Sequence, residues 1–147
     1  MSLVQKISDD AKIAQKQGSA QRLGVLRFAL AQIHNREIEL KVKEVGLSDA
    51  EALQVLQREA KKRREAIALF EQGGRKDLAD KEAAELKILG DYLPPAAGQA
   101  EIETVIAELI GQGNRDVNGL MKLAMQKLQG RVDGKLVREL VLKKLQA

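Results

Sequence analysis

The sequence predicts an all-α protein with two parts, an N-terminal four-helix bundle-like domain and a smaller C-terminal tail domain of three helices. Good helix formers dominate the composition, in which 44% of residues are hydrophobic and 31% are charged. Apolar residues recur at spacings of three and four, which is the period of an amphipathic helix, and no stretch alternates as a strand would. Both prolines stand together at Pro94-Pro95, where one helical series ends and another begins.

Two amphipathic helices are expected at the start of the chain. Ser2 is a suitable N-cap and Gly18 a suitable C-terminal stop for the first helix. The second begins near Gln21 and fades through residues 37–40, and residues 41–46 are expected to form a loop or a frayed helix end. The inward positions of the two helices are Leu3, Val4, Ile7, Ala11 and Ala14, then Leu23, Leu26, Leu30 and Ile33.

A capping box marks the start of the third helix. Ser48 can accept from the third helical N–H while Glu51 reaches back to the cap, so a helix should begin here and run to Gln72. Gly73-Gly74 supplies the left-handed stop. A fourth helix should cover residues 76–92, with Tyr92 packing inward and its hydroxyl reaching solvent, before Pro94-Pro95 ends it.

The stretch of residues 94–98, Pro-Pro-Ala-Ala-Gly, is the predicted linker between a domain of residues 1–93 and one of residues 99–147. Three helices should follow it: one from Glu101 to Gly111 or Gly113, one over residues 116–128, and one over residues 133–145 with Asp133 as N-cap. Met121 and Met125 lie one turn apart and are expected to fill the core of this tail.

Positive charge is concentrated near the C-terminus. From Arg115 onward there are eight basic and three acidic residues, whereas the preceding residues hold 17 basic and 18 acidic ones. A helical module with such a field favours a polyanionic partner, because surface charge raises the on-rate of an oppositely charged molecule. Composition alone predicts only a helical binding protein.

Two stretches, residues 57–95 and residues 119–145, resemble the GatB/YqeY family. The first resembles the family's long charged helix, Gly-rich turn and closing Tyr-Leu-Pro, and the second resembles its C-terminal motif of Gly130, Asp133, Gly134 and Lys135. The resemblance implies two helical domains similar to the end of the B subunit of the tRNA-dependent amidotransferase, a region that contacts tRNA. It also implies similarity to a module appended to some glutaminyl-tRNA synthetases. Stand-alone members of the family have no firmly assigned reaction.

The residues themselves favour binding over catalysis. The chain has no Cys and one His, and no glycine loop ends in Gly-Lys-Ser/Thr, so neither catalytic residues nor a cofactor nor a metal site is predicted. His34 is interpreted as a surface or half-buried residue, and Asp49, Glu51, Asp77 and Asp80 as caps and solvated faces. Amidation with glutamine as amido donor, the reaction that the family name suggests, is the least favoured alternative.

The predicted RNA-binding residues surround the break between the last two helices. They are Lys127, Arg131, Lys135 and Arg138. With two Phe, one Tyr and no Trp, stacking on splayed bases is disfavoured, so contacts to phosphates and riboses of a folded RNA are expected, with tRNA as the partner. The alternative is an adaptor that docks on an aminoacyl-tRNA synthetase or an amidotransferase.

The basic run at residues 61–64 is interpreted differently. Four successive residues cover most of a helix circumference, and i,i+4 pairs from Glu59 to Arg63 and from Lys61 to Glu65 would partly neutralise the run. It is therefore expected to be a solvated helix face. With no long apolar run, the chain is predicted to have no membrane partner and to be cytoplasmic.

Overall fold

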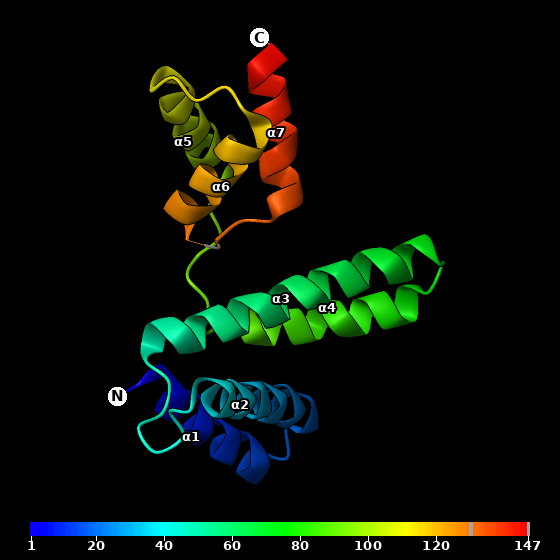
Figure 1. Cartoon of the computed structure of the whole chain (residues 1–147). Coiled ribbons are helices and arrows are strands. Elements are labelled where there is room, and N and C mark those ends of the chain that lie inside the picture. The colour runs from blue at the N-terminus through cyan, green and yellow to red at the C-terminus, as the bar shows by residue number, and fades with distance from the viewer. Residues whose placement is uncertain (130, 147) are drawn as a thin grey trace. The chain divides into compact units, whose positions relative to one another are not determined.

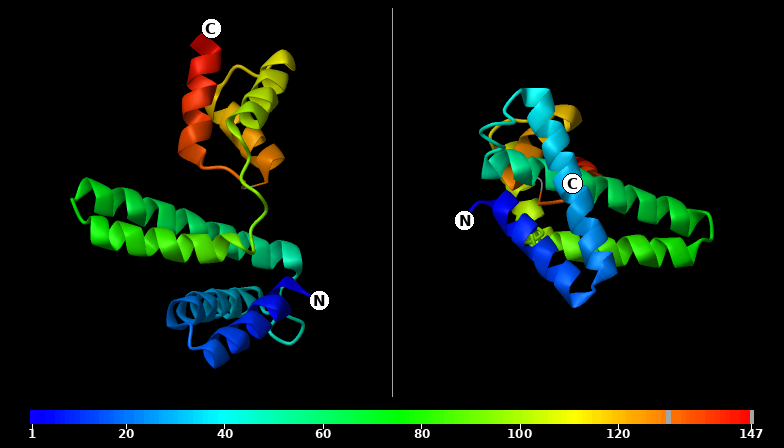
Figure 2. Two further views of the ribbon diagram at one scale, coloured as in Figure 1. Left: turned by 180° about the vertical axis from the view of Figure 1, so that it is seen from behind. Right: turned by 90° about the horizontal axis from the view of Figure 1, so that it is seen from below.

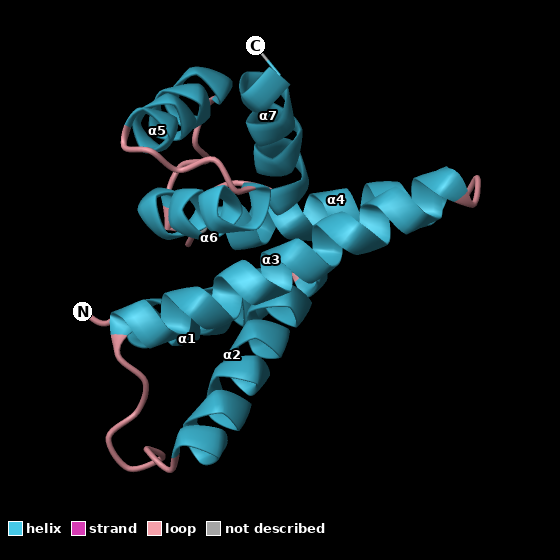
Figure 3. Cartoon of the chain, turned by 45° about the horizontal axis from the view of Figure 1, so that its top comes forward, coloured by secondary structure: helices cyan, strands magenta, loops and turns pink. Residues whose placement is uncertain are grey.

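The computed structural model describes residues 1–129 and 131–146, and every regular element in these ranges is an α-helix (Figure 1). The predicted all-α class is therefore confirmed, as the colouring by secondary structure in Figure 3 also shows. The helices are α1 (Leu3–Gln17), α2 (Ala20–Leu40), α3 (Asp49–Gln72), α4 (Lys76–Gly90), α5 (Gln99–Gly111), α6 (Val117–Leu128) and α7 (Gly134–Gln146). The chain divides into two compact units, Met1–Leu93 and Pro94–Ala147.

In the first unit, α3 and α4 lie side by side as a long antiparallel hairpin (Figure 1). The pair formed by α1 and α2 packs against that hairpin, and α2 crosses it steeply, as the right-hand view of Figure 2 shows. The core of the unit lies where these two pairs meet. Its fully buried large side chains are Ile7, Leu26, Ile33, Leu56 and Leu89.

Caps that were predicted from single residues set the helix ends. The Ser2 hydroxyl accepts from the backbone N–H of Gln5, and both hydrogen bonds of the Ser48–Glu51 capping box are present. Gly18 ends α1 with a left-handed φ of 70°. Helix α4 ends at Gly90, two residues earlier than expected. The backbone N–H groups of residues 91–93 donate to carbonyls three residues earlier, and Leu93 is disfavoured in a helix because it precedes a proline.

Tyr92 occupies a different environment from the one predicted. The residue is 7% exposed, and its hydroxyl, which was expected to reach solvent, donates to Asp10 at 2.6 Å and accepts from Arg22 at 3.2 Å. Arg22 also pairs with Asp91 at 3.1 Å. Asp10, Arg22 and Tyr92 thus connect α1, α2 and the end of α4, a set of contacts that no local sequence pattern indicates.

Arg63 also departs from the prediction of a solvated face. It is 9% exposed and pairs with Glu59, as expected for an i,i+4 pair, but also with Glu82 and Glu85 of α4. Its neighbours in the run differ, because Lys61 and Lys62 are exposed and Arg64 is half-buried. Arg63 thus helps to hold the two helices of the hairpin together.

In the second unit, α5, α6 and α7 each pack against the other two. The core is aliphatic, and its large fully buried side chains are Ile102, Ile106, Leu109, Leu120, Leu128, Val137 and Val141. Met121 and Met125 pack against this core, as predicted. Helix α5 begins at Gln99, two residues before the expected start, because Gly98 takes the extended N-cap conformation.

Candidate nucleic-acid interface

Lys127 is placed by helix α6. The carboxylate of Asp116 caps this helix by accepting from the backbone N–H of Gly119 at 2.8 Å. Leu120, Ala124 and Leu128 face the core, so the remaining surface of the last turn, with Lys127, is exposed. A cation in the last turn also interacts favourably with the helix dipole.

Lys135 and Arg138 are placed by helix α7. Asp133 accepts from the backbone N–H of Lys135 at 3.1 Å, so it caps the helix as predicted. Val137, Leu140 and Val141 face the core, and Lys135 and Arg138, one turn apart, are exposed on the same face. The side chains of Lys127, Lys135 and Arg138 make no hydrogen bond or ion pair with any residue that the structure describes.

Arg131 has a structural partner instead. Its Nη1 and Nη2 atoms donate to the two carboxylate oxygens of Glu101 at 2.9 and 3.0 Å, and its Nε donates to the carbonyl of Pro95 at 2.9 Å. Its own carbonyl accepts from the backbone N–H of Ala97. Arg131 therefore holds the segment before α5 against the connection between α6 and α7. We do not include it among the cations free to meet an anion.

The three remaining candidates flank the connection between α6 and α7. Only six residue steps separate the end of α6 at Leu128 from the start of α7 at Gly134, so these ends lie within roughly 20 Å of each other. Lys122, Lys143 and Lys144 are further exposed cations on the same two helices. We call the exposed cations Lys127, Lys135 and Arg138 the tail cations.

Charge within the second unit is polarised. Helix α5 carries three acidic residues and no basic one, whereas α6 and α7 together carry six basic residues and one acidic one. Counted over Pro94–Ala147, the unit holds eight basic and six acidic residues, so its net charge is lower than a count from Arg115 indicates. The positive field belongs to the surface of α6 and α7 rather than to the whole unit.

The other candidates for chemistry are dispersed. His34 is exposed and its Nδ1 lies 3.2 Å from a carboxylate oxygen of Glu37, so its position agrees with the predicted surface role. The pKa of Asp77 is lowered by the hydrogen bond from Arg75, and the pKa of Glu51 is lowered by the backbone N–H of Ser48, which is the behaviour of turn and capping residues. Among the described residues, no group of three His, Asp or Glu side chains is arranged to hold a metal ion.

The chain matches a known protein family over nearly its whole length. The model of the family described as Yqey-like protein matches residues 4–145, which is nearly the whole chain. The chain belongs to the YqeY-like family. The resemblance that the sequence motifs indicated is therefore confirmed for this family.

Two curated relatives are similar to this YqeY-like chain. A protein of Pyrenophora tritici-repentis named altered inheritance of mitochondria protein 41, mitochondrial, is 28% identical over 147 residues, covering 96% of this chain and 77% of the relative. A protein of the same name from Kluyveromyces lactis is 30% identical over 106 residues, covering 71% of this chain and 56% of the relative. Within the described part of the YqeY-like chain, no helix is long and apolar enough to cross a membrane.

Proposed function

We propose that this YqeY-like protein is a non-catalytic RNA-binding module that holds a folded RNA, with tRNA as the expected partner, through the surface of α6 and α7. One observation carries the proposal: the tail cations are exposed and have no carboxylate partner among the described residues. Neutralising phosphates with such cations releases condensed counterions, which drives binding and makes it sensitive to salt.

The lack of aromatic residues in the second unit supports one mode of contact. No Phe, Tyr or Trp occurs in the sequence of residues 94–147. A surface without an aromatic ring offers no platform for base stacking, so we propose contacts to phosphates and riboses, which read the shape of the RNA and not its bases. Such a module would act beside tRNA-dependent amidation or aminoacylation. As part of the same proposal we place it in the cytoplasm, although both relatives carry mitochondrial names.

Charge reversal at two of the tail cations tests the proposal. We expect Lys135→Glu/Arg138→Glu to weaken the binding of bulk tRNA at low salt about tenfold, because two phosphate contacts are replaced by repulsion. Both side chains are exposed, so the midpoint of thermal unfolding should not change. Filter binding at two salt concentrations gives the affinities.

The matched control is Lys12→Glu/Lys16→Glu on α1. These two lysines are also exposed and one helical turn apart, and they lie outside the second unit. The control changes the net charge of the whole protein by the same amount. If both variants lose the same affinity, binding depends on net charge alone, and the surface of α6 and α7 is not the interface.

An adaptor role is the second candidate. Its docking surface would be the exposed face of the long helix α3, which includes Leu69 at 67% exposure. An adaptor that docks on a synthetase or an amidotransferase through this helix would not bind purified tRNA at any salt concentration. Absence of tRNA binding at low salt would thus remove the first proposal and leave the second.

A further inference from the structure

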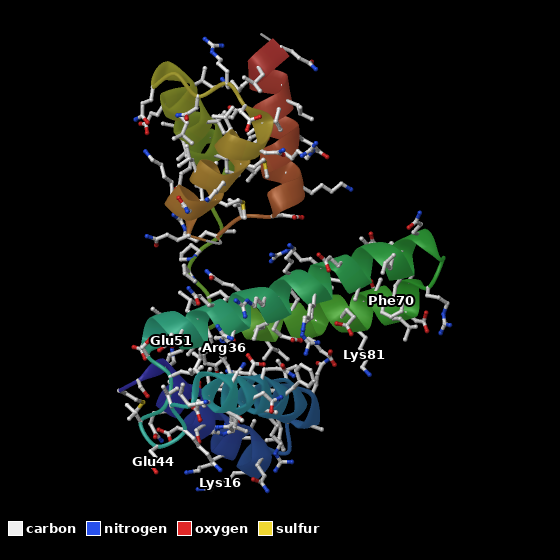
Figure 4. All side chains as sticks on the ribbon, viewed as in Figure 1. Lys16, Arg36, Glu44, Glu51, Phe70 and Lys81 are labelled. Atoms are coloured by element: carbon white, nitrogen blue, oxygen red, sulfur yellow. The ribbon has the colours of Figure 1, made fainter. Side chains whose placement is uncertain are left out.

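A polar hollow lies between α2 and α3 of the first unit, distant in sequence from the tail cations. Its volume is about 170 Å³. Three cations line it, Arg36 from α2 and Arg58 and Lys62 from α3. Gln32 and Asn35 line it from α2 as well, and their side-chain amides are able to donate hydrogen bonds. Figure 4 shows Arg36 at the junction of these helices.

Two of the three cations in this hollow have no ion-pair partner among the residues that the structure describes. Arg36 donates to Glu39 at 2.8 Å, and the other acidic residue of the lining, Glu59, pairs with Arg63 at 3.2 Å. Both acids of the lining therefore have a cation already. The side chains of Arg58 and Lys62 are exposed and make no ion pair with any residue within the described ranges. They lie one helical turn apart, so both can reach one anion.

An exposed aromatic ring lies on α2 one helical turn before Gln32, outside the lining of the hollow. Phe28 precedes Gln32 by one turn of α2, so the two side chains share a face of that helix. Phe28 is 46% exposed, whereas Tyr92, another of the three aromatic residues, is 7% exposed. The guanidinium carbon of Arg63 lies 5.9 Å from the centre of the Phe28 ring, a distance within the range of a cation–π contact.

We propose that the hollow and the Phe28 ring form a site for one nucleotide, with its phosphate held by Arg58 and Lys62 and its base stacked on Phe28. The two cations and the amide donors suit a phosphate group, and the exposed face of the Phe28 ring suits any base. The source of the nucleotide is either an unpaired residue of an RNA strand or a free nucleotide. The site does not include the tail cations, so a test of this site is independent of a test of the proposed function.

Nuclear magnetic resonance of the full chain tests the site with three probes at equal ionic strength. Adenosine 5′-monophosphate should shift the Phe28 ring resonances and the side-chain amides of Gln32 and Asn35. Ribose 5-phosphate should shift the amides and leave the ring resonances unchanged. If adenosine 5′-monophosphate shifts neither set, the proposal is overturned.

The third probe, a single-stranded oligoadenylate of six residues, distinguishes the sources. If the oligonucleotide produces the same pattern, the site accepts an RNA strand. If only the mononucleotide produces it, the site is upheld for a free nucleotide. Bulk tRNA binding measured with Arg58→Glu/Lys62→Glu and with Lys135→Glu/Arg138→Glu separates this site from the tail surface.

Two variants assign the two halves of the site. Phe28→Leu keeps an apolar side chain of similar bulk, and should weaken adenosine 5′-monophosphate about fivefold or more while leaving ribose 5-phosphate unchanged. Arg58→Glu/Lys62→Glu should abolish the amide shifts that adenosine 5′-monophosphate and ribose 5-phosphate produce. Lys12→Glu/Lys16→Glu should leave these shifts unchanged. Equal affinity of Phe28→Leu and the unchanged protein for the mononucleotide would overturn the stacking half of the proposal. Amide shifts that survive in Arg58→Glu/Lys62→Glu would overturn the phosphate half.

Discussion

Arg131 and Glu101 form a two-bonded ion pair, with guanidinium nitrogens 2.9 and 3.0 Å from the two carboxylate oxygens, although 30 residues separate them in the sequence. The pair joins the first turn of α5 to the connection between α6 and α7. Planar guanidinium and carboxylate groups match each other in this geometry, which makes the pair stronger than a single contact between a lysine and a carboxylate.

A double-mutant cycle on this pair tests its structural role. With side chains 27% and 46% exposed, we expect a coupling energy of about 1 kcal/mol between Arg131→Gln and Glu101→Gln in urea unfolding. Lys127→Gln combined with Glu101→Gln serves as the control and should show no coupling, since Lys127 has no partner among the described residues. Additive effects at Arg131 and Glu101 would contradict the assignment.

The capping box at the start of α3 gives a prediction with an internal control. The Ser48 hydroxyl accepts from the backbone N–H of Glu51, whereas Ser19 holds the N-cap position of α2 without a side-chain cap bond. Ser48→Ala should therefore lower the free energy of unfolding by about 1 kcal/mol, and Ser19→Ala by only a few tenths. Equal costs for the two serines, measured by urea unfolding, would show that the cap is not formed.

Arg63 is the buried cation on which the α3–α4 hairpin depends. Replacing it by Met leaves Glu59, Glu82 and Glu85 without their shared partner, and should cost about 3 kcal/mol of stability. Lys62→Met, one residue away and exposed, should change stability by at most about 0.5 kcal/mol. Thermal unfolding of both variants gives the comparison, and similar midpoints would contradict the role of Arg63.

Tyr92 predicts a loss of stability at alkaline pH. Burial, and then the hydrogen bond to Asp10, raise the pKa of Tyr92 above its ordinary value of 10.0. Because the folded state keeps the phenol proton at a pH where the unfolded chain releases it, this stabilisation is complete below pH 10.0 and is lost as the pH rises above it.

The measurement compares Tyr92→Phe with the unchanged protein. Below about pH 9 the variant should be less stable by about 1 kcal/mol, because the hydrogen bonds to Asp10 and Arg22 are missing. Above about pH 10 the unfolding free energy of the unchanged protein should fall toward that of the variant. A difference between the two proteins that stays constant up to about pH 11 would contradict the raised pKa of Tyr92.

Local patterns predicted most of the helices, and distant contacts account for what they missed. Ser48 with Glu51 and Gly18 act through neighbours a few residues away, so their roles follow from the sequence. Glu101 pairs with Arg131, and Glu82 pairs with Arg63. These partners are far apart in the sequence, so no local pattern indicates that they meet. The sequence pattern therefore groups Arg131 with the three other candidate site residues although Arg131 has a carboxylate partner, and no local pattern indicates the contact between Phe28 and Arg63.

The salt dependence of tRNA affinity tests the central proposal most directly. If Lys127, Lys135 and Arg138 neutralise three phosphates, a plot of the logarithm of the binding constant against the logarithm of salt concentration should have a slope between about −2 and −3. Lys135→Glu/Arg138→Glu should make that slope shallower by about 2. A slope near zero, or no binding of tRNA even at low salt, would contradict the account.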